Sequence, residues 1–183
     1  MRRTLVAMVQ DQPGVLNRIV SLFRRRNFNI ESLTVGHSEV PGVSRLTMVV
    51  EAKNVPAEQF VYQLDRLVNI IDVTDLTETD SVVRELALVK VKADSETRSE
   101  VMQLVEIFRA KIIDVGLHSL VIEASGPEDR VQSLISLLKS FGILEIVRTG
   151  RVAMTRGPGS SNHRQTGSGR VRGQPALVKS AVA

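Results

Sequence analysis

The feature that most limits how this chain can fold is one order of strand-like and helix-like patterns that occurs twice. In each half, a strand is followed by a helix, two strands, a second helix and a last strand. The patterns cover 3–9, 14–27, 29–38, 43–51, 56–68 and 70–76 in the first half, and 85–93, 96–109, 112–117, 119–125, 127–141 and 143–149 in the second. This order is the split βαβ of ferredoxin-like domains, in which four antiparallel strands carry two helices on one face. The sequence therefore predicts an α+β fold of two tandem ferredoxin-like βαββαβ domains.

Turn-forming and capping residues mark where several of these elements begin and end. Pro13-Gly14 separates the first strand from the first helix, and Asn27 is expected to end that helix. Pro41-Gly42 predicts a turn between the second and third strands, and Pro56 suits the first turn of a helix. In the second half, Ser95 is the expected N-cap. The apolar stripe expected on the second helix consists of Phe60, Val61, Leu64, Leu67 and Val68.

Composition divides the chain into two small domains and a tail. A polar stretch at 77–81 is typical of a linker, so the domains are predicted at 1–77 and 84–157. Residues 158–183 are rich in Gly, Ser, Arg, Asn and Gln, and we expect this tail to be disordered. Each small sheet has helices on one face, so its other face needs a cover. We therefore expect the halves to associate with each other or with another chain.

The charge distribution argues against a nucleic-acid binder. The chain has 24 Lys+Arg and 20 Asp+Glu, and its net charge is +4. From Gly157 onward there are four basic residues and no acidic one, so the folded part is neutral. A nucleic-acid surface would need a basic face with aromatic residues, and the chain has one Tyr and no Trp. No apolar run approaches the length of a membrane span.

The absence of cysteine removes several classes of site. With no Cys, the chain holds no disulfide, thiolate zinc site, iron–sulfur cluster or cysteine nucleophile. His37 and His118 have no carboxylate at metal-ligand spacing and are interpreted as surface or strand residues. No phosphate-binding or nucleophile motif is present. We expect a cytoplasmic protein without a catalytic or metal site.

The turn from the first strand into the first helix is the candidate binding site. Gly14 lets a ligand approach the backbone, and the first helical N–H groups favour a carboxylate. A side-chain oxygen of Asp11 is placed to accept from an ammonium. Together these groups suit an amino-acid zwitterion. The alternative is ordinary helix capping by Asp11 before Pro-Gly.

Two further polar features each have two interpretations. Asn29 is expected to lie opposite the first turn, where its amide can bind a ligand carboxylate or carbonyl. Alternatively, it is a turn residue that satisfies its own backbone. The run 24–26 consists of three arginines at a helix end, where cations are favourable. It is either a solvated helix end or a docking surface for an acidic partner.

Several longer motifs make the chain recognisable. They lie at 1–3, 13–16, 28–35 and 44–48 in the first half, and at 84–91, 107–115 and 148–157 in the second. With them the chain resembles the regulatory (small) subunits of acetolactate synthase, also called acetohydroxyacid synthase. The resemblance covers about residues 1–157, and the Asn-Ile-Glu-Ser-Leu-Thr sequence that begins at Asn29 is its most specific part.

The resemblance implies an ACT domain at 1–77, an ACT-like domain after it, and a regulatory role. Such a subunit does no chemistry and holds no cofactor. It binds and activates a catalytic (large) subunit, which is expected to carry thiamine diphosphate, Mg²⁺ and FAD. It also confers feedback inhibition by valine or another branched-chain amino acid, in the biosynthesis of valine, leucine and isoleucine.

The family's effector site implies a homodimer through ACT domains, because the effector lies at the interface of two such domains. Many members carry Asn where this chain has Asp11; the carboxylate still accepts from an ammonium but repels a carboxylate. Carried over to this chain, the effector-binding positions are Asp11, Gln12, Pro13, Gly14, Val15, Leu16, Asn29 and Ile30.

Two rival functions make different demands on the sequence. An amino-acid-sensing transcriptional regulator needs a helix-turn-helix, and none precedes the first strand. A free-standing enzyme on this fold needs a convergent acid–base or metal site, and the motifs contain none. Neither demand is met.

Overall fold

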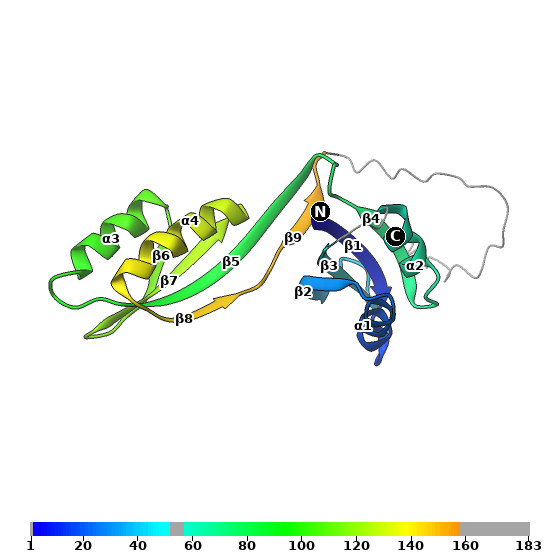
Figure 1. Cartoon of the computed structure of the whole chain (residues 1–183), viewed down its shortest axis with the longest axis horizontal. Coiled ribbons are helices and arrows are strands. Elements are labelled where there is room, and N and C mark those ends of the chain that lie inside the picture. The colour runs from blue at the N-terminus through cyan, green and yellow to red at the C-terminus, as the bar shows by residue number, and fades with distance from the viewer. Residues whose placement is uncertain (1, 52–56, 158–183) are drawn as a thin grey trace, which may run out of the picture.

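The computed structural model describes residues 2–51 and 57–157 (Figure 1). Two predictions lie outside these residues: the helix start at Pro56 and the disordered tail at 158–183. Within them, two α+β domains lie side by side and are joined where residues 81–84 pair with residues 152–155 (Figure 1). No helix of the described residues is long and apolar enough to cross a membrane.

The N-terminal domain has the predicted order and a four-stranded antiparallel sheet. The sheet order is β2-β3-β1-β4, so β2 and β4 are edge strands. Its elements are β1 (Arg2–Gln10), α1 (Val15–Arg25), β2 (Asn29–His37), β3 (Val43–Glu51), α2 (Ala57–Asp65) and β4 (Ile70–Asp75). Asn27 has φ 55° and follows the end of α1, so the predicted helix stop is confirmed.

The C-terminal domain repeats this arrangement with the sheet order β6-β7-β5-β8. The two-domain α+β prediction is therefore confirmed. Its elements are β5 (Ser81–Lys92), α3 (Arg98–Ile107), β6 (Lys111–Val115), β7 (Ser119–Gly126), α4 (Glu128–Leu138), the 3₁₀ turn η1 (Lys139–Phe141), β8 (Ile143–Arg148) and β9 (Val152–Thr155).

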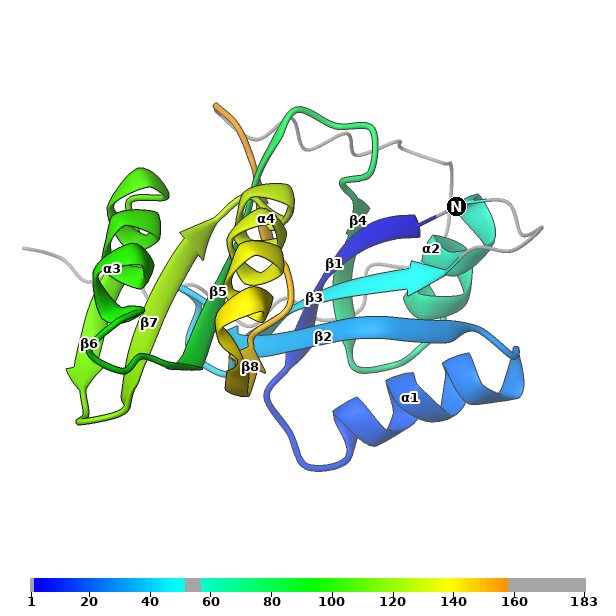
Figure 2. The same ribbon diagram turned by 60° about the vertical axis from the view of Figure 1, so that its left-hand side comes forward.

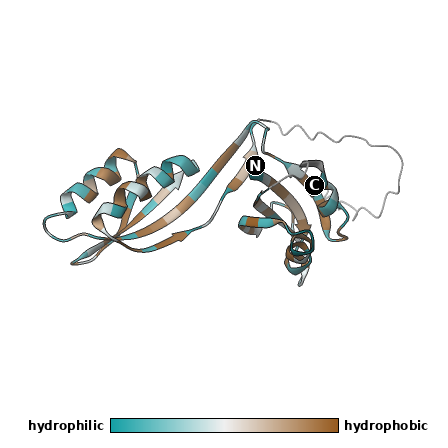
Figure 3. Cartoon of the chain, viewed as in Figure 1, coloured by the Kyte–Doolittle hydropathy of each residue, from teal (hydrophilic) through white to brown (hydrophobic). Residues whose placement is uncertain are grey.

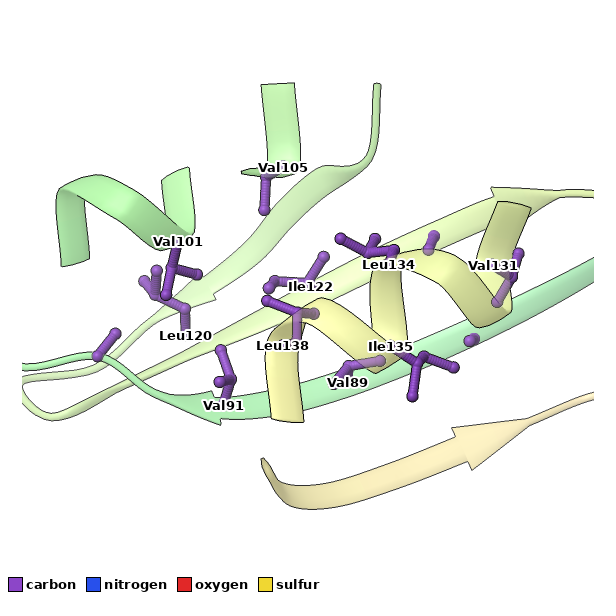
Figure 4. Packing of buried hydrophobic residues seen from close by; sticks show 13 residues of the cluster. Val89, Val91, Val101, Val105, Leu120, Ile122, Val131, Leu134, Ile135 and Leu138 are labelled. Atoms are coloured by element: carbon purple, nitrogen blue, oxygen red, sulfur yellow. The ribbon is translucent and has the colours of Figure 1, made fainter. Parts of the chain in front are cut away.

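Each domain has its own hydrophobic core between its helices and one face of its sheet. In the N-terminal core, Phe28 lies 4.4 Å from Phe60 and 5.8 Å from Phe23, measured between ring centroids. In the C-terminal core, Leu134 and Leu138 of α4 pack toward the sheet (Figure 4). In the C-terminal domain, α3 and α4 show hydrophilic residues along the sides turned away from the sheet (Figure 3). The apolar face of each helix therefore packs on its sheet, as the amphipathic patterns predict.

Three local predictions are wrong. Val68 lies in a turn beyond α2 and its side chain is 81% exposed, so it is not part of the helix stripe. Ser95 does not cap α3; the carboxylate of Asp94 accepts from the backbone N–H groups of Glu96 and Thr97 instead. The strand predicted from Glu85 begins at Ser81, four residues earlier.

The early start of β5 has a partner that the sequence patterns did not reveal. Residues 81–84 pair antiparallel with β9, in the register Ser81 to Thr155 and Arg84 to Val152. This two-stranded extension leads from the C-terminal sheet to the N-terminal domain (Figure 1). Ala153 of β9 then packs with Val6 and Leu76 on the N-terminal sheet face that carries no helix. The two halves thus cover part of an open sheet face between them.

The chain between β8 and β9 contacts β2 directly. Gly150 has φ 79°, and a Cβ added there would lie 2.8 Å from the Cβ of Ser32. The hydroxyl of Thr34 donates to the Thr149 carbonyl oxygen over 2.9 Å. Arg45 donates to the Ala153 carbonyl oxygen, also over 2.9 Å. Backbone of the C-terminal domain therefore lies on the N-terminal sheet with almost no space between them.

Charged side chains border this junction around a cleft of ≈ 430 Å³. Glu128, at the start of α4, pairs with Arg151 and with Arg2 of β1. Arg2 also pairs with Glu31. Glu128 thus joins cations from both domains, which places an ion-pair network across the junction.

These pairs make Glu128 sensitive to pH. Its burial disfavours the charged form, but hydrogen bonds and charge from Arg151 and Arg2 outweigh the burial and lower the pKa of the Glu128 carboxyl. A carboxyl with a lowered pKa stabilises the fold above its unfolded pKa, and that contribution is lost as the pH falls through the folded pKa. The junction should therefore be weaker in acid.

Replacing Glu128 by Gln tests this coupling. We expect Glu128→Gln to lower the free energy of unfolding by about 1–2 kcal/mol at pH 7, and the difference from the parent to shrink below about pH 4. Urea unfolding of the full chain at several pH values measures it. Glu145→Gln is the matched control, because Glu145 is exposed on β8 and has no ion pair within the described residues. Equal pH profiles for Glu128→Gln and the parent would contradict the assignment.

Candidate functional site

The loop between β1 and α1 is held from both sides by backbone hydrogen bonds. The Asp11 N–H donates to the Gly42 carbonyl oxygen over 2.8 Å, and the Gln10 N–H donates to the Asn69 carbonyl oxygen over 2.9 Å. Gly14 then adopts φ 85° and ψ −7° at the N-cap position of α1. This left-handed conformation favours glycine, because a Cβ there is strained.

The start of α1 presents unsatisfied donors. The Val15 N–H donates to the Gln12 carbonyl oxygen, and the Arg18 N–H donates to the Gly14 carbonyl oxygen. Between them, the N–H groups of Leu16 and Asn17 have no acceptor within the described part of the chain, and no side chain caps the helix. Such amides at a helix N-terminus favour an anion. The alternative that Asp11 caps this helix is wrong.

The Asp11 carboxylate lies beside the loop and is open to solvent. Its side chain is 49% exposed, and its Oδ2 lies 3.5 Å from Nδ1 of His37, at the end of β2. His37 itself is 88% exposed. An acceptor for an ammonium and two donors for a carboxylate thus flank one exposed glycine turn. This is the charge pattern of an amino-acid zwitterion.

Asn69 holds the loop between β1 and α1 through side-chain hydrogen bonds. This residue was not predicted from the sequence. It is 8% exposed and lies just before β4. Its Nδ2 donates to the side-chain oxygens of Gln10 and Gln12, while its Oδ1 accepts from Arg18. A buried amide with these partners holds the loop against the first turn of α1. The one sequence signal is its position before a strand, which is common to many turn residues.

Asn29 does not lie opposite the first turn of its own chain, so that expectation is wrong. Asn29 pairs with Glu51, whereas His37 pairs with Ser44 next to the loop. The nine residues of β2, from Asn29 to His37, are separated by eight steps of about 3.3 Å and so span about 26 Å. Because β1 and β2 both run antiparallel to β3, the start of β2 lies at the far end of the sheet. The positions predicted to bind an effector therefore lie in two separate places within one chain.

The remaining apolar positions divide by role. Val15 is 5% exposed and belongs to the core, and Ile30 packs against that core from β2. These two residues position the site from inside. Leu16 is 43% exposed on α1, where an aliphatic ligand or another chain can contact it. Gln12, Pro13 and Gly14 are exposed as well.

The other candidates singled out in the sequence lie elsewhere. His118 is exposed directly before β7, in the other domain. No group of three or more His, Cys, Asp or Glu side chains able to hold a metal ion occurs among the residues that the structure describes. Arg24, Arg25 and Arg26 are exposed at the end of α1.

Comparisons with known proteins place both domains. Residues 84–157 match the family model of the small subunit of acetolactate synthase, and residues 5–72 match that of the AHAS small subunit-like ACT domain. A probable acetolactate synthase small subunit from Archaeoglobus fulgidus is 49% identical over 157 residues, covering 86% of this chain and 98% of that protein. The acetolactate synthase small subunit of Bacillus subtilis is 46% identical over 159 residues, covering 86% of this chain and 92% of that protein.

A solved structure agrees with this match. The crystal structure of the acetolactate synthase small subunit from Thermotoga maritima superposes with a TM-score of 0.79 and 44% sequence identity. The match covers 86% of this chain and 98% of that chain, so it includes both domains and their arrangement. On sequence and structure together, the chain belongs to the family of acetolactate synthase small subunits.

Proposed function

We propose that this chain is the non-catalytic regulatory subunit of acetolactate synthase. In this role it binds the catalytic subunit, raises its activity and makes it sensitive to valine or another branched-chain amino acid. The observation that carries the proposal is the loop at Gly14, which combines unsatisfied N–H groups with a nearby carboxylate at Asp11. Family membership supplies the enzyme.

The loop suits the effector's charged groups in a defined orientation. The ligand carboxylate accepts from the N–H groups of Leu16 and Asn17, where the helix dipole adds to the attraction. The ligand ammonium faces Asp11. The aliphatic side chain then contacts Leu16, which is exposed beside these groups. In this arrangement Asp11 faces the ligand's ammonium and not its carboxylate, which it would repel.

A homodimer completes this half-site. Among the described residues β2 pairs with β3 alone, so its outer backbone groups are open to a second copy. If two β2 strands pair antiparallel about Leu33, Asn29 of one copy lies opposite His37 of the other, since both are four residues from Leu33. Asn29 then reaches the Asp11–Gly14 loop, which is next to His37 in its own chain. This pairing unites the separated effector positions.

Self-association is the first test. Sedimentation of the full chain at micromolar concentration is expected to give at least twice the 20.2 kDa mass of one chain. Exposed apolar residues Leu16, Val20 and Val35 near this edge favour the same result. A Val35→Lys variant should shift the equilibrium toward monomer, because the added charge lies beside the paired edge. A strict monomer with and without valine would contradict the dimer and the shared site.

The regulatory role itself is tested by reconstitution. The catalytic subunit, supplied with thiamine diphosphate, Mg²⁺ and FAD, is assayed for acetolactate production alone and with this chain. We expect the chain to raise the rate and valine to lower it, while the chain alone produces no acetolactate. Stimulation without a valine response would limit the role to activation, and no binding between the two chains would refute the proposal.

A further inference from the structure

Five exposed arginines line a groove on the helix side of the N-terminal domain. Four come from α1 and the residue after it, and one directly follows α2; they are Arg18, Arg24, Arg25, Arg26 and Arg66. Two adjoining hollows of ≈ 530 and ≈ 390 Å³ lie among them and share Arg25 and Leu67. We call this surface the arginine groove.

The positive charge of the arginine groove is not neutralised within the described residues. Arg18 and Arg26 donate to the neutral amides of Asn69 and Gln63. Arg66 lies 5.6 Å from the centroid of the Tyr62 ring. None of the five forms an ion pair with a carboxylate of the described residues. Elsewhere in these residues arginines do pair with carboxylates, namely Arg2, Arg3, Arg148, Arg151 and Arg156.

Helix stabilisation accounts for part of this cluster. Arg24 and Arg25 occupy the last turn of α1, where a cation is favourable. Arg18 is the fourth residue of α1, close to the positive end of the helix dipole, and Arg66 follows a different helix, α2. Neither gains from the dipole of α1. Their convergence on one groove therefore needs another reason, and a negatively charged partner supplies one.

The location of the groove leaves it accessible in a regulatory assembly. The C-terminal domain contacts the opposite face of the N-terminal sheet, through Ala153 and Gly150. The proposed dimer uses the β2 edge. In Figure 1, α1 lies on the side of the N-terminal sheet away from β9, and Figure 2 shows α1 along one side of that sheet. The arginine groove is thus separate from both surfaces.

We propose that the arginine groove docks an acidic surface of the catalytic subunit. The proposal rests on the proposed regulatory function. A second copy of the groove is repelled, because it carries the same charges. The chain's own residues 158–183 are repelled too, since they contain basic residues and no acidic one. Nucleic acid is disfavoured because Tyr62 is the one aromatic side chain beside the groove among the described residues, and single strands need stacking platforms.

Docking on this groove connects the catalytic subunit to the effector loop through a single helix. The 11 residues of α1 span about 16 Å, with Gly14 at one end and Arg25 at the other. A partner on the groove and an effector at the N-terminus therefore contact the same rigid element. A change in the position of α1 on effector binding is felt directly at the docking surface.

A charge-reversal variant tests the docking surface. The test variant is Arg25→Glu/Arg66→Glu, and a first control, Arg25→Lys/Arg66→Lys, keeps the positive charge. A second control, Arg109→Glu/Lys139→Glu, makes the same change in net charge at exposed sites of the C-terminal domain. The Kd for the catalytic subunit is measured by calorimetry at two salt concentrations, with full-length chains. We expect a rise of about ten-fold or more for the first variant at low salt, and a weaker salt dependence. The other two should stay within about two-fold of the parent.

The Kd of the charge-reversed variant for valine is measured as well. This measurement distinguishes a failure of docking on the arginine groove from a failure of the proposed regulatory function. Unchanged valine affinity and unchanged sedimentation, with weakened binding of the catalytic subunit, support the arginine groove. Equal losses in the charge-reversed variant and the C-terminal control overturn it, as does a groove variant that binds like the parent. A variant that loses self-association or RNA binding, but keeps the catalytic subunit, also overturns it. If the parent does not bind the catalytic subunit, the proposed function fails instead.

Discussion

Replacing Gly14 by Asp is expected to weaken valine binding ten- to hundred-fold and to abolish feedback, while stimulation of the catalytic subunit persists. Gly14 occupies the N-cap position of α1, and the amides at the second and third helical positions, Leu16 and Asn17, are unsatisfied. An Asp side chain at an N-cap accepts from these same positions. The new carboxylate therefore takes the donors that the effector needs and repels the effector's charge. Losing one charge-assisted hydrogen bond costs about 1.5–3 kcal/mol, which corresponds to this range of affinity.

The fold should tolerate the change. Gly14 has φ 85°, so any side chain there is strained by about 1–2 kcal/mol. Asp and Asn adopt this conformation more readily than other residues, and the new cap contributes about 1 kcal/mol in return. A Cβ at this position meets nothing within 4 Å. We therefore expect a small change in the free energy of unfolding.

Two further substitutions separate the causes. Gly14→Ala adds the backbone strain without a cap or a charge, and Gly14→Asn adds a cap without a charge. The Kd for valine should rise in the order Ala, Asn, Asp. Calorimetry on the isolated chain gives these values, and acetolactate production by the reconstituted pair across a valine titration gives the feedback.

Each outcome has a definite meaning for the site. If Gly14→Asp remains as valine-sensitive as the parent, the loop does not bind the effector. Equal effects of Ala and Asp would assign the loss to backbone strain and not to the proposed carboxylate contact. Loss of stimulation together with feedback would place the docking surface, and not just the effector, at this loop.

The element order was predictable because each element carries its own periodic pattern. Residues 85–92 alternate between buried and less buried side chains, and α4 buries Val131, Leu134, Ile135 and Leu138 at helical spacing. Such patterns depend on neighbours along the chain. The sheet face that each residue occupies follows directly from them.

Non-local pairing was not predictable in this way. Ser81 looked like linker because the residues before it are polar, and β9 has four residues, too few to show a period. Residues 81–84 and β9 form strands because they pair with each other, although Ser81 and its partner Thr155 are 74 residues apart in the sequence. The candidate site could not be predicted for the same reason. Asn29 and Gly14 lie at opposite ends of one sheet, and local patterns do not reveal which strands of two copies pair in a dimer.

The junction between the domains should depend on Gly150 more than on any one of its ion pairs. Gly150→Ala is expected to lower the free energy of unfolding by about 2–4 kcal/mol. Part of this loss is the left-handed backbone, since Gly150 has φ 79°. The larger part is steric, because the new Cβ would lie 2.8 Å from the Cβ and 2.9 Å from the Oγ of Ser32. Ser32 belongs to β2 and its Oγ is buried, so its Cβ cannot move away without a shift of the strand.

Two variants isolate the steric part, with urea unfolding as the measurement. Gly42→Ala changes a glycine of φ 76° with nothing within 4 Å of the new Cβ, so it should cost about 1–2 kcal/mol from the backbone alone. Ser32→Gly removes the side chain that the new Cβ meets. In a double-mutant cycle, Gly150→Ala should cost at least about 1 kcal/mol less in the Ser32→Gly background than in the parent. If the two changes are additive, Gly150 does not contact Ser32 in solution. The domains would then be held together by their ion pairs and by the pairing of β5 with β9. In that case Glu128→Gln would lower the free energy of unfolding by more than Gly150→Ala does.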